Sequence, residues 1–179
     1  NIVRLSEKVH KIHGMMGSLD VTKVHWKNCP TAWKGQFQGR EKYAGFGLEA
    51  FVDNNLWFWH AAFGFLGTLN DINIWERSAL LESMVNCEHE KLDFDYVVDG
   101  EVFSKLFYLV NGIHPSLSCF ISSEPDPHTN IAYSFAADQE AHRKDIERGF
   151  GVLKIKFLVL ITLSIYIIMT TFIIWYWVV

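Results

Sequence analysis

Runs of apolar and aromatic residues in the first third of the chain constrain the fold more than any other feature. Residues 15–26, MMGSLDVTKVHW, predict one extended segment, and residues 44–65 predict two β-strands joined at the polar turn Asp53-Asn54-Asn55. Strands of this kind are expected to form a sheet, and the elements that follow them decide what covers that sheet.

The next segment, residues 69–85, predicts a helix. Apolar side chains recur there at helical spacing, and the residues before them suit the start of a helix. Either Asn70 or Asp71 stands where an N-cap residue is expected. As the N-cap, Asp71 would have a purely structural role.

A hairpin and a long helix complete the pattern. Residues 92–98 and 102–110 are apolar runs on either side of the turn Asp99-Gly100, and residues 116–130 predict a loop that contains Pro and Ser. Residues 136–154 are charged, rich in Ala and helical in pattern. Strands first, then a helix, a hairpin and a closing helix predict an α/β domain in which helices cover the faces of a sheet.

Composition changes after Lys156. The run Phe157–Val179 carries no charge over 23 residues. As a helix it would be about 35 Å long, enough to cross a bilayer. Basic residues at 148, 154 and 156 precede it and would keep the preceding domain cytosolic. The sequence therefore divides into a domain at residues 1–156 and an apolar C-terminal helix at 157–179 that is a candidate tail anchor.

The overall charge and the cysteines exclude some classes of protein. A net charge of −4 argues against a broad electrostatic grip on DNA or RNA, although an enzyme with an acidic, metal-loaded site is compatible with it. The three cysteines are odd in number and widely spaced. This matches neither a disulfide framework nor a zinc site and favours a reducing compartment. The chain starts at Asn1 rather than Met, and we expect a fragment or a mispredicted open reading frame.

Several of the acidic residues have a structural explanation. Asp53 and Asp99 lie in predicted turns. Asp138, Glu140 and Asp145 fit the solvated face of a helix. These residues are therefore set aside as candidates for a functional site.

Three polar residues have both a structural and a functional interpretation. Asp20 lies in an extended apolar segment, away from any turn, where a buried and unpaired charge would be costly, so a salt bridge within the strand would explain it. Glu147 lies beside the apolar stripe of the predicted closing helix and could pair with Arg143 or Arg148. Asn111 follows an apolar strand and precedes a glycine, which suits an ordinary turn residue.

Four blocks of the sequence support the functional interpretation. They are GSLDVTKVHWKNCPTAWKGQFQGRE, LEAFVDNNLWFWHAAFGFLGTLNDINIWERS, YLVNGIHP and AHRKDIERGFGVLK. With these blocks in this order over residues 12–157, the chain resembles the PIF/Harbinger family of DDE transposases and their domesticated nuclease relatives. The resemblance implies an RNase H-like fold, a mixed sheet flanked by helices, in which carboxylates from distant parts of the sequence hold two divalent metal ions.

Residue by residue, the resemblance implies that Asp20 is the first catalytic aspartate and Glu147 the catalytic glutamate. Asp71 matches an aspartate counted among the metal-site residues, and its interpretation as an N-cap stays open beside this one. The second catalytic aspartate of the family stands in a block similar to YLADGIYP, where this chain has Asn111. Between Asn111 and Glu147 lie 35 residues, a spacing typical of the DDE arrangement. The implied metal ligands are thus Asp20, Asp71, Asn111 and Glu147.

The implied function is a metal-dependent DNA endonuclease or transposase in the nucleus, with Mg²⁺ or Mn²⁺ as cofactor and DNA as partner. Hard cations prefer anionic oxygen ligands, so Asn111 is expected to weaken both metal binding and catalysis. Two alternatives stay open: a non-catalytic RNase H-like module that binds DNA or a protein, and a tail-anchored membrane protein of transposon origin. The helical DNA-binding region that the family has upstream has no counterpart here, which predicts a separate DNA-binding partner protein.

The resemblance offers a second interpretation of the C-terminal run. Ile168–Ile174 resembles a final core helix of the family, while the polar segment expected before it is missing. Phe157–Val179 is therefore either a core helix fused to apolar sequence by deletion or frameshift, or a membrane anchor. Both interpretations predict one helix without a polar break, and only the second predicts contact with a membrane.

Overall fold

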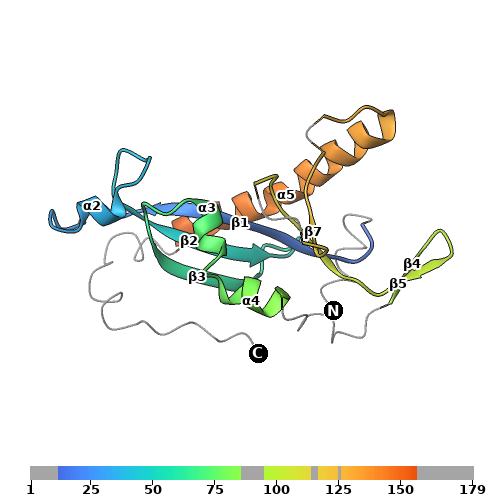
Figure 1. Cartoon of the computed structure of the whole chain (residues 1–179), viewed down its shortest axis with the longest axis horizontal. Helices are drawn as coiled ribbons and strands as arrows, with labels where there is room; N and C mark the ends of the chain where they lie inside the picture. Colours follow the sequence, from blue (N-terminus) through green and yellow to red (C-terminus); the bar gives the residue numbers. More distant parts are fainter. Residues whose placement is uncertain (1–11, 86–94, 114–116, 125, 157–179) are drawn as a thin grey trace.

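The computed structural model describes residues 12–85, 95–113, 117–124 and 126–156 (Figure 1). Its main sheet consists of β1 (Met15–His25), β2 (Gly45–Val52), β3 (Phe58–Leu66), β6 (Phe107–Leu109) and β7 (Phe120–Ile121). A two-stranded sheet consists of β4 (Tyr96–Val98) and β5 (Glu101–Phe103). The described helices are α2 (Lys34–Phe37), α3 (Asp71–Trp75), α4 (Ala79–Val85) and α5 (Asn130–Lys156).

The main sheet is mixed and has the strand order β3-β2-β1-β6-β7. Strands β1, β2 and β3 are antiparallel neighbours. Strands β6 and β7 extend the sheet on the other side of β1 in the parallel direction. Strand β1 is therefore central. The predicted α/β architecture, a mixed sheet flanked by helices, is confirmed.

The predicted turn at Asp53 joins β2 to β3 and is held by a buried carboxylate. Asp53 Oδ1 accepts hydrogen bonds from the backbone N–H groups of Asn55 and Trp57, at 2.8 and 3.0 Å. Asp53 Oδ2 accepts a third from the indole N–H of Trp59, at 3.0 Å. Asp53 thus organises the turn, as predicted.

The helix predicted at residues 69–85 is in fact two short helices. Asn70 is the N-cap of α3, since its side-chain oxygen accepts a hydrogen bond from the backbone N–H of Asn73 at 2.8 Å. Ser78 begins a new helix, because its hydroxyl oxygen accepts hydrogen bonds from the N–H groups two and three residues further along. Asp71 is therefore the first residue inside α3 and not its cap, so the capping interpretation of Asp71 is wrong.

The hairpin predicted over residues 92–110 is shorter than expected. Within the described residues it comprises β4 and β5, around Asp99 and Gly100, whose φ angles of 51° and 86° suit a tight hairpin turn. The chain then leaves the hairpin, and β6 joins the main sheet next to β1. Burial explains the difference, because β5 is exposed throughout whereas Tyr108 and the two residues after it are buried. The segment predicted as a loop at 116–130 also differs from the prediction, because it contains the short strand β7 of the main sheet.

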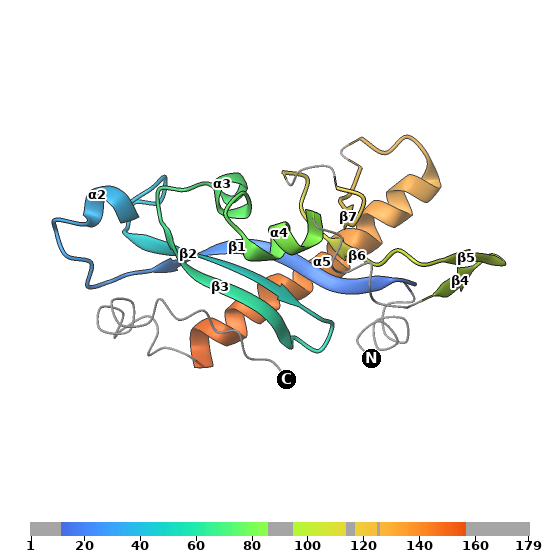
Figure 2. The ribbon, with the colours of Figure 1, turned by 60° about the horizontal axis from the view of Figure 1, so that its bottom comes forward.

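Helices cover both faces of the main sheet. Figure 2 shows α3 and α4 on one side of the strands and α5 crossing the other side. Side chains alternate between the two faces along β1. Leu19 and Val21 accordingly pack under α3 and α4, whereas Val24 packs with Ile146 and Phe150 of α5.

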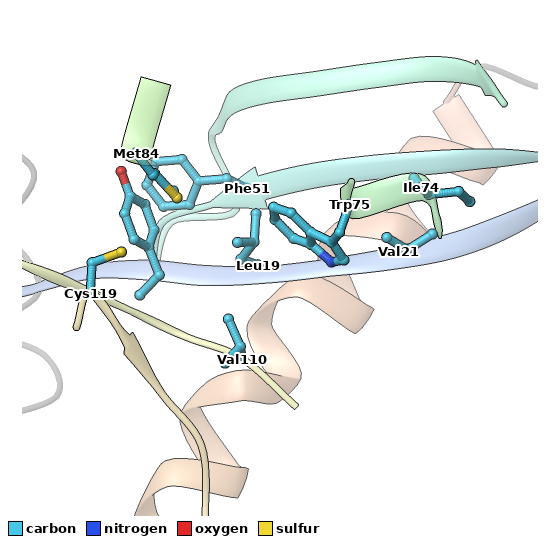
Figure 3. Packing of buried hydrophobic residues seen from close by; sticks show 9 residues of the cluster. Leu19, Val21, Phe51, Ile74, Trp75, Met84, Val110 and Cys119 are labelled. Atoms are coloured by element: carbon cyan, nitrogen blue, oxygen red, sulfur yellow. The ribbon is translucent and has the colours of Figure 1, made fainter. Parts of the chain in front are cut away.

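The core under α3 and α4 is built around Trp75. Its indole is 1% exposed and lies over β1 beside Leu19, with Val21 nearby (Figure 3). The ring also meets Phe120 edge-on, with ring centroids 5.7 Å apart. Trp75 thus fastens the short helix α3 to the sheet, and with it Asp71 at the start of that helix.

The apolar run Phe157–Val179 lies outside the described residues, so its helix and its membrane contact stay predictions. Helix α5 ends at Lys156, directly before it. Among the helices that the structure describes, none combines the length and the apolar character needed to span a membrane.

Candidate functional site

Asp20 lies on the central strand β1, on the face that α5 covers. Its neighbours on this face tie the strand to the helix. The Ser18 hydroxyl donates a hydrogen bond to the backbone carbonyl of His142 at 3.0 Å, and the Lys154 ammonium donates one to the Thr22 hydroxyl at 3.0 Å. Asp20 stands between Ser18 and Thr22 and is therefore held against the middle of α5.

Asn111 follows β6 and lies next to Asp20. Strands β1 and β6 are parallel, and Ser18 is in register with Leu109. Asp20 and Asn111, each two residues further along the chain, therefore lie side by side. The Asn111 NH₂ group donates a hydrogen bond to Asp20 Oδ1 at 3.3 Å. The Asn111 carbonyl oxygen accepts one from the N–H of Ile113 at 3.3 Å. Asn111 is thus both a turn residue and a direct partner of Asp20.

Gln139 holds α5 in this place, a role that the sequence pattern alone does not indicate. Its buried NH₂ group donates hydrogen bonds to the carbonyl oxygens of Val110 at 3.0 Å and of Ile121 at 3.2 Å, beside the ends of β6 and β7. Arg143 follows one helical turn later and Glu147 one turn after that. The spacing of four between these polar residues is the signal that places them on one face of α5.

Arg143 connects Glu147 to Asp20. Its Nη1 lies 3.7 Å from Asp20 Oδ2 and 3.2 Å from Glu147 Oε1, and its Nη2 lies 3.6 Å from Glu140 Oε1. The side chains of Arg143 and Asp20 are 15% and 14% exposed, whereas that of Glu147 is 52% exposed. Asp20, Asn111 and Glu147 therefore gather at one place, with a guanidinium between the two carboxylates.

Asp71 lies on α3, which packs on the opposite face of the sheet. Burial raises the pKa of the Asp71 carboxyl group, and the positive charge of Lys23 opposes this effect. The negative charge of Asp71 is in turn one of the smaller causes that raise the pKa of Asp20. Asp71 thus acts on Asp20 through its charge, from the other side of β1.

Asp20 has a strongly perturbed carboxyl group. Burial raises the pKa of Asp20 from 3.8 to about 6. The backbone N–H of Val21, which donates to Asp20 Oδ1 at 2.8 Å, and the charge of Arg143 lower this pKa, but by less than burial raises it. Repulsion from Asp71 and Glu147 adds to the rise. A carboxyl group of this kind is typical of functional sites.

The raised pKa makes stability depend on pH. The folded chain binds the Asp20 proton more tightly than the unfolded chain does, so the free energy of unfolding should fall as pH rises from about 4 through about 6. A shift of this size corresponds to about 3 kcal/mol. Asp20→Asn should remove this slope and be more stable than the parent chain at about pH 8. Urea denaturation at several pH values measures the slope.

Asp126→Asn is the control for this prediction. The Asp126 carboxylate is 86% exposed, so neutralising it should leave the slope of the parent chain unchanged. If the slope of Asp20→Asn equals that of the parent, the assigned perturbation of Asp20 is wrong.

Of the four oxygen ligands predicted for a divalent metal ion, Asp20, Asn111 and Glu147 are close together and Asp71 lies on α3 at the opposite face of the sheet, and this arrangement does not fit a metal ion. Asn111 turns its NH₂ group toward Asp20, and the guanidinium of Arg143 lies between Asp20 and Glu147. Within the described residues, no group of three or more His, Cys, Asp or Glu side chains could hold a metal ion. The metal site therefore stays a prediction from the sequence.

Comparison with known proteins bears on the origin of this chain. A family model described as a plant transposon protein matches residues 1–179. No match is found among curated proteins or among solved structures.

Proposed function

This chain belongs to the plant transposon protein family, and from that premise we propose that it is the RNase H-like domain of a DDE transposase of the PIF/Harbinger type. Its reaction would be hydrolysis or strand transfer at a phosphodiester bond of DNA. Mg²⁺ or Mn²⁺ would be the cofactor and the nucleus the place of action. Family membership supports the transposon origin, and the geometry of the site supports the DDE assignment.

The observation that carries the proposal is the meeting of Asp20, Asn111 and Glu147. The DDE arrangement has an acid on a first strand, an acid at the end of a later strand and a glutamate on a following helix. Asp20 lies on β1, Asn111 two residues after the end of β6 and Glu147 on α5. Asp20 and Asn111 are 91 positions apart in sequence and are joined by a hydrogen bond of 3.3 Å. Arg143 joins Glu147 to them.

Asn111 limits the activity expected of the parent chain. An amide has one carbonyl oxygen and no charge, whereas the matching residue of the family is a carboxylate. The carbonyl oxygen of Asn111 also accepts a hydrogen bond from Ile113. We therefore expect weak activity, with Asp71 as a further acidic residue near the site.

A non-catalytic module that binds DNA or a protein is the second candidate, and the contacts of Arg143 favour it. The guanidinium already compensates the charges of Asp20 and Glu147 without a metal ion. The net charge of −4 also implies that a grip on DNA would need a separate, more basic partner protein.

Nicking of supercoiled plasmid DNA separates the two candidates. The parent chain should nick slowly in Mn²⁺ or Mg²⁺, because two of the three ligand positions keep their carboxylates, and EDTA should stop the reaction. Asp20→Ala should lower the rate by about tenfold or more, since it removes a carboxylate at the reacting centre. Asp126→Ala changes an exposed carboxylate and should leave the rate unchanged. Equal rates in Asp20→Ala and the parent would favour the non-catalytic module.

A further inference from the structure

The guanidinium of Arg143 lies among three carboxylates. Nη1 contacts Asp20 and Glu147, and Nη2 contacts Glu140. A guanidinium keeps its charge at any physiological pH. Most of the Arg143 side chain is also shielded from water, which strengthens its attraction to the carboxylates. One permanent positive charge thus stands where these acidic groups converge.

Both oxygens of Asp20 already have partners. Oδ1 accepts hydrogen bonds from the N–H of Val21 at 2.8 Å and from the NH₂ of Asn111 at 3.3 Å. Oδ2 faces Nη1 of Arg143 at 3.7 Å. These groups take up about three of the four lone-pair sites of the carboxylate, so a metal ion on Oδ2 would compete with the guanidinium of Arg143.

Hydrogen bonds at two residues that precede Arg143 fix α5, and with it the backbone of Arg143, against the sheet. Gln139, one turn earlier, is bonded to the carbonyl oxygens of Val110 and Ile121. His142, the preceding residue, accepts a hydrogen bond from Ser18 on β1. Sliding the helix would break these bonds, so the guanidinium can leave the carboxylates only by rotation of its own side chain.

We propose that Arg143 is the resident cation of this site: its guanidinium occupies the position of a divalent ion between Asp20 and Glu147 and weakens the binding of that ion by the parent chain. This inference rests on the proposed function and deepens it. Asn111 removes one negative charge from the ligand set, and Arg143 neutralises the charges that remain. Both residues act against metal binding. Asn111 does so because it lacks a carboxylate, whereas Arg143 does so through its positive charge, with the carboxylates of Asp20 and Glu147 still present.

A Mn²⁺ titration of the free protein tests the role of Arg143. Arg143→Gln should bind Mn²⁺ about tenfold more tightly than the parent, because it removes one positive charge beside a half-buried carboxylate pair. Mn²⁺ should also raise the Tm of Arg143→Gln more than that of the parent. Arg143→Lys should fall between them, since a compact ammonium cannot bridge carboxylates as the guanidinium fork does. Lys144→Gln removes the same charge from a side chain that pairs with Glu140, and should bind as the parent does.

Equal Mn²⁺ affinity in Arg143→Gln and Lys144→Gln would overturn the proposal. If Arg143→Gln does not fold, Arg143→Lys decides, and an affinity equal to that of the parent overturns the proposal as well. The titration contains no DNA, so its result is independent of nicking. If Arg143→Gln binds Mn²⁺ more tightly than the parent but DNA is not nicked, the role of Arg143 is upheld and the nuclease assignment is overturned. If DNA is nicked but Arg143→Gln binds Mn²⁺ as the parent does, the nuclease assignment is upheld and the role of Arg143 is overturned.

Discussion

Asn111→Asp is expected to raise metal-dependent nicking of plasmid DNA by about a hundredfold or more over the parent chain. Aspartate and asparagine are nearly isosteric, so the change adds a charge with little repacking. It replaces the NH₂ group that now donates to Asp20 at 3.3 Å with a second carboxylate. Two facing carboxylates repel each other unless a cation lies between them. The single positive charge of Arg143 already pairs with Asp20 and Glu147, so the added negative charge favours the binding of a divalent ion.

The measurement is the conversion of supercoiled plasmid to open circles in Mg²⁺ or Mn²⁺, with EDTA as the blank. Adding Asp20→Ala or Glu147→Ala to Asn111→Asp should return the rate to that of the parent or lower. Asn130→Asp is the matched control, because it makes the same chemical change at an exposed residue at the start of α5 and should have no effect. Equal rates in Asn111→Asp and the parent would show that Asn111 is not a ligand position.

Local sequence patterns predict the antiparallel strands β2 and β3 because the turn that joins them is held by residues close together in sequence. Asp53 illustrates this, since all three groups that its carboxylate binds lie within six residues of it. The prediction of one hairpin strand at residues 102–110 is wrong because the division of this run into β5 and β6 depends on β1, far away in sequence. Burial of Leu109 next to Ser18 is a tertiary effect that no local pattern contains.

The candidate site was predictable only through the family resemblance. Helical spacing places Glu147 beside the apolar stripe of α5, but it does not show that Arg143 reaches across to Asp20. Asp145 reveals the same limit. Its prediction as part of a solvated face is wrong, because it is 2% exposed and paired with Arg148. An ion pair with a buried carboxylate and a fully solvated pair have the same sequence pattern at this spacing, and only the packing of α5 against the sheet separates them.

Trp75→Ala is expected to lower the free energy of unfolding by about 3 to 5 kcal/mol, the range for removing a buried indole. Trp75 is 1% exposed, packs on Leu19 and Val21 and meets Phe120 edge-on. Its removal would leave a cavity between α3 and β1 that the sheet, fixed by its hydrogen bonds, can close only in part. Since domains of this kind are stable by only about 5 to 15 kcal/mol, a large share of the chains could unfold. Urea denaturation followed by circular dichroism measures the loss.

Trp57→Ala is the matched control, because the Trp57 side chain is 57% exposed and its removal should change stability by less than about 1 kcal/mol. The same substitution also bears on Asp71. Helix α3 has five residues, too few to persist by itself, so the packing of Trp75 is what keeps Asp71 near Asp20. Trp75→Ala should therefore weaken the charge repulsion between Asp71 and Asp20 and lower the pKa of Asp20 in whatever fraction stays folded. An Asp20 pKa unchanged in folded Trp75→Ala, measured by NMR titration, would show that α3 is held by other contacts.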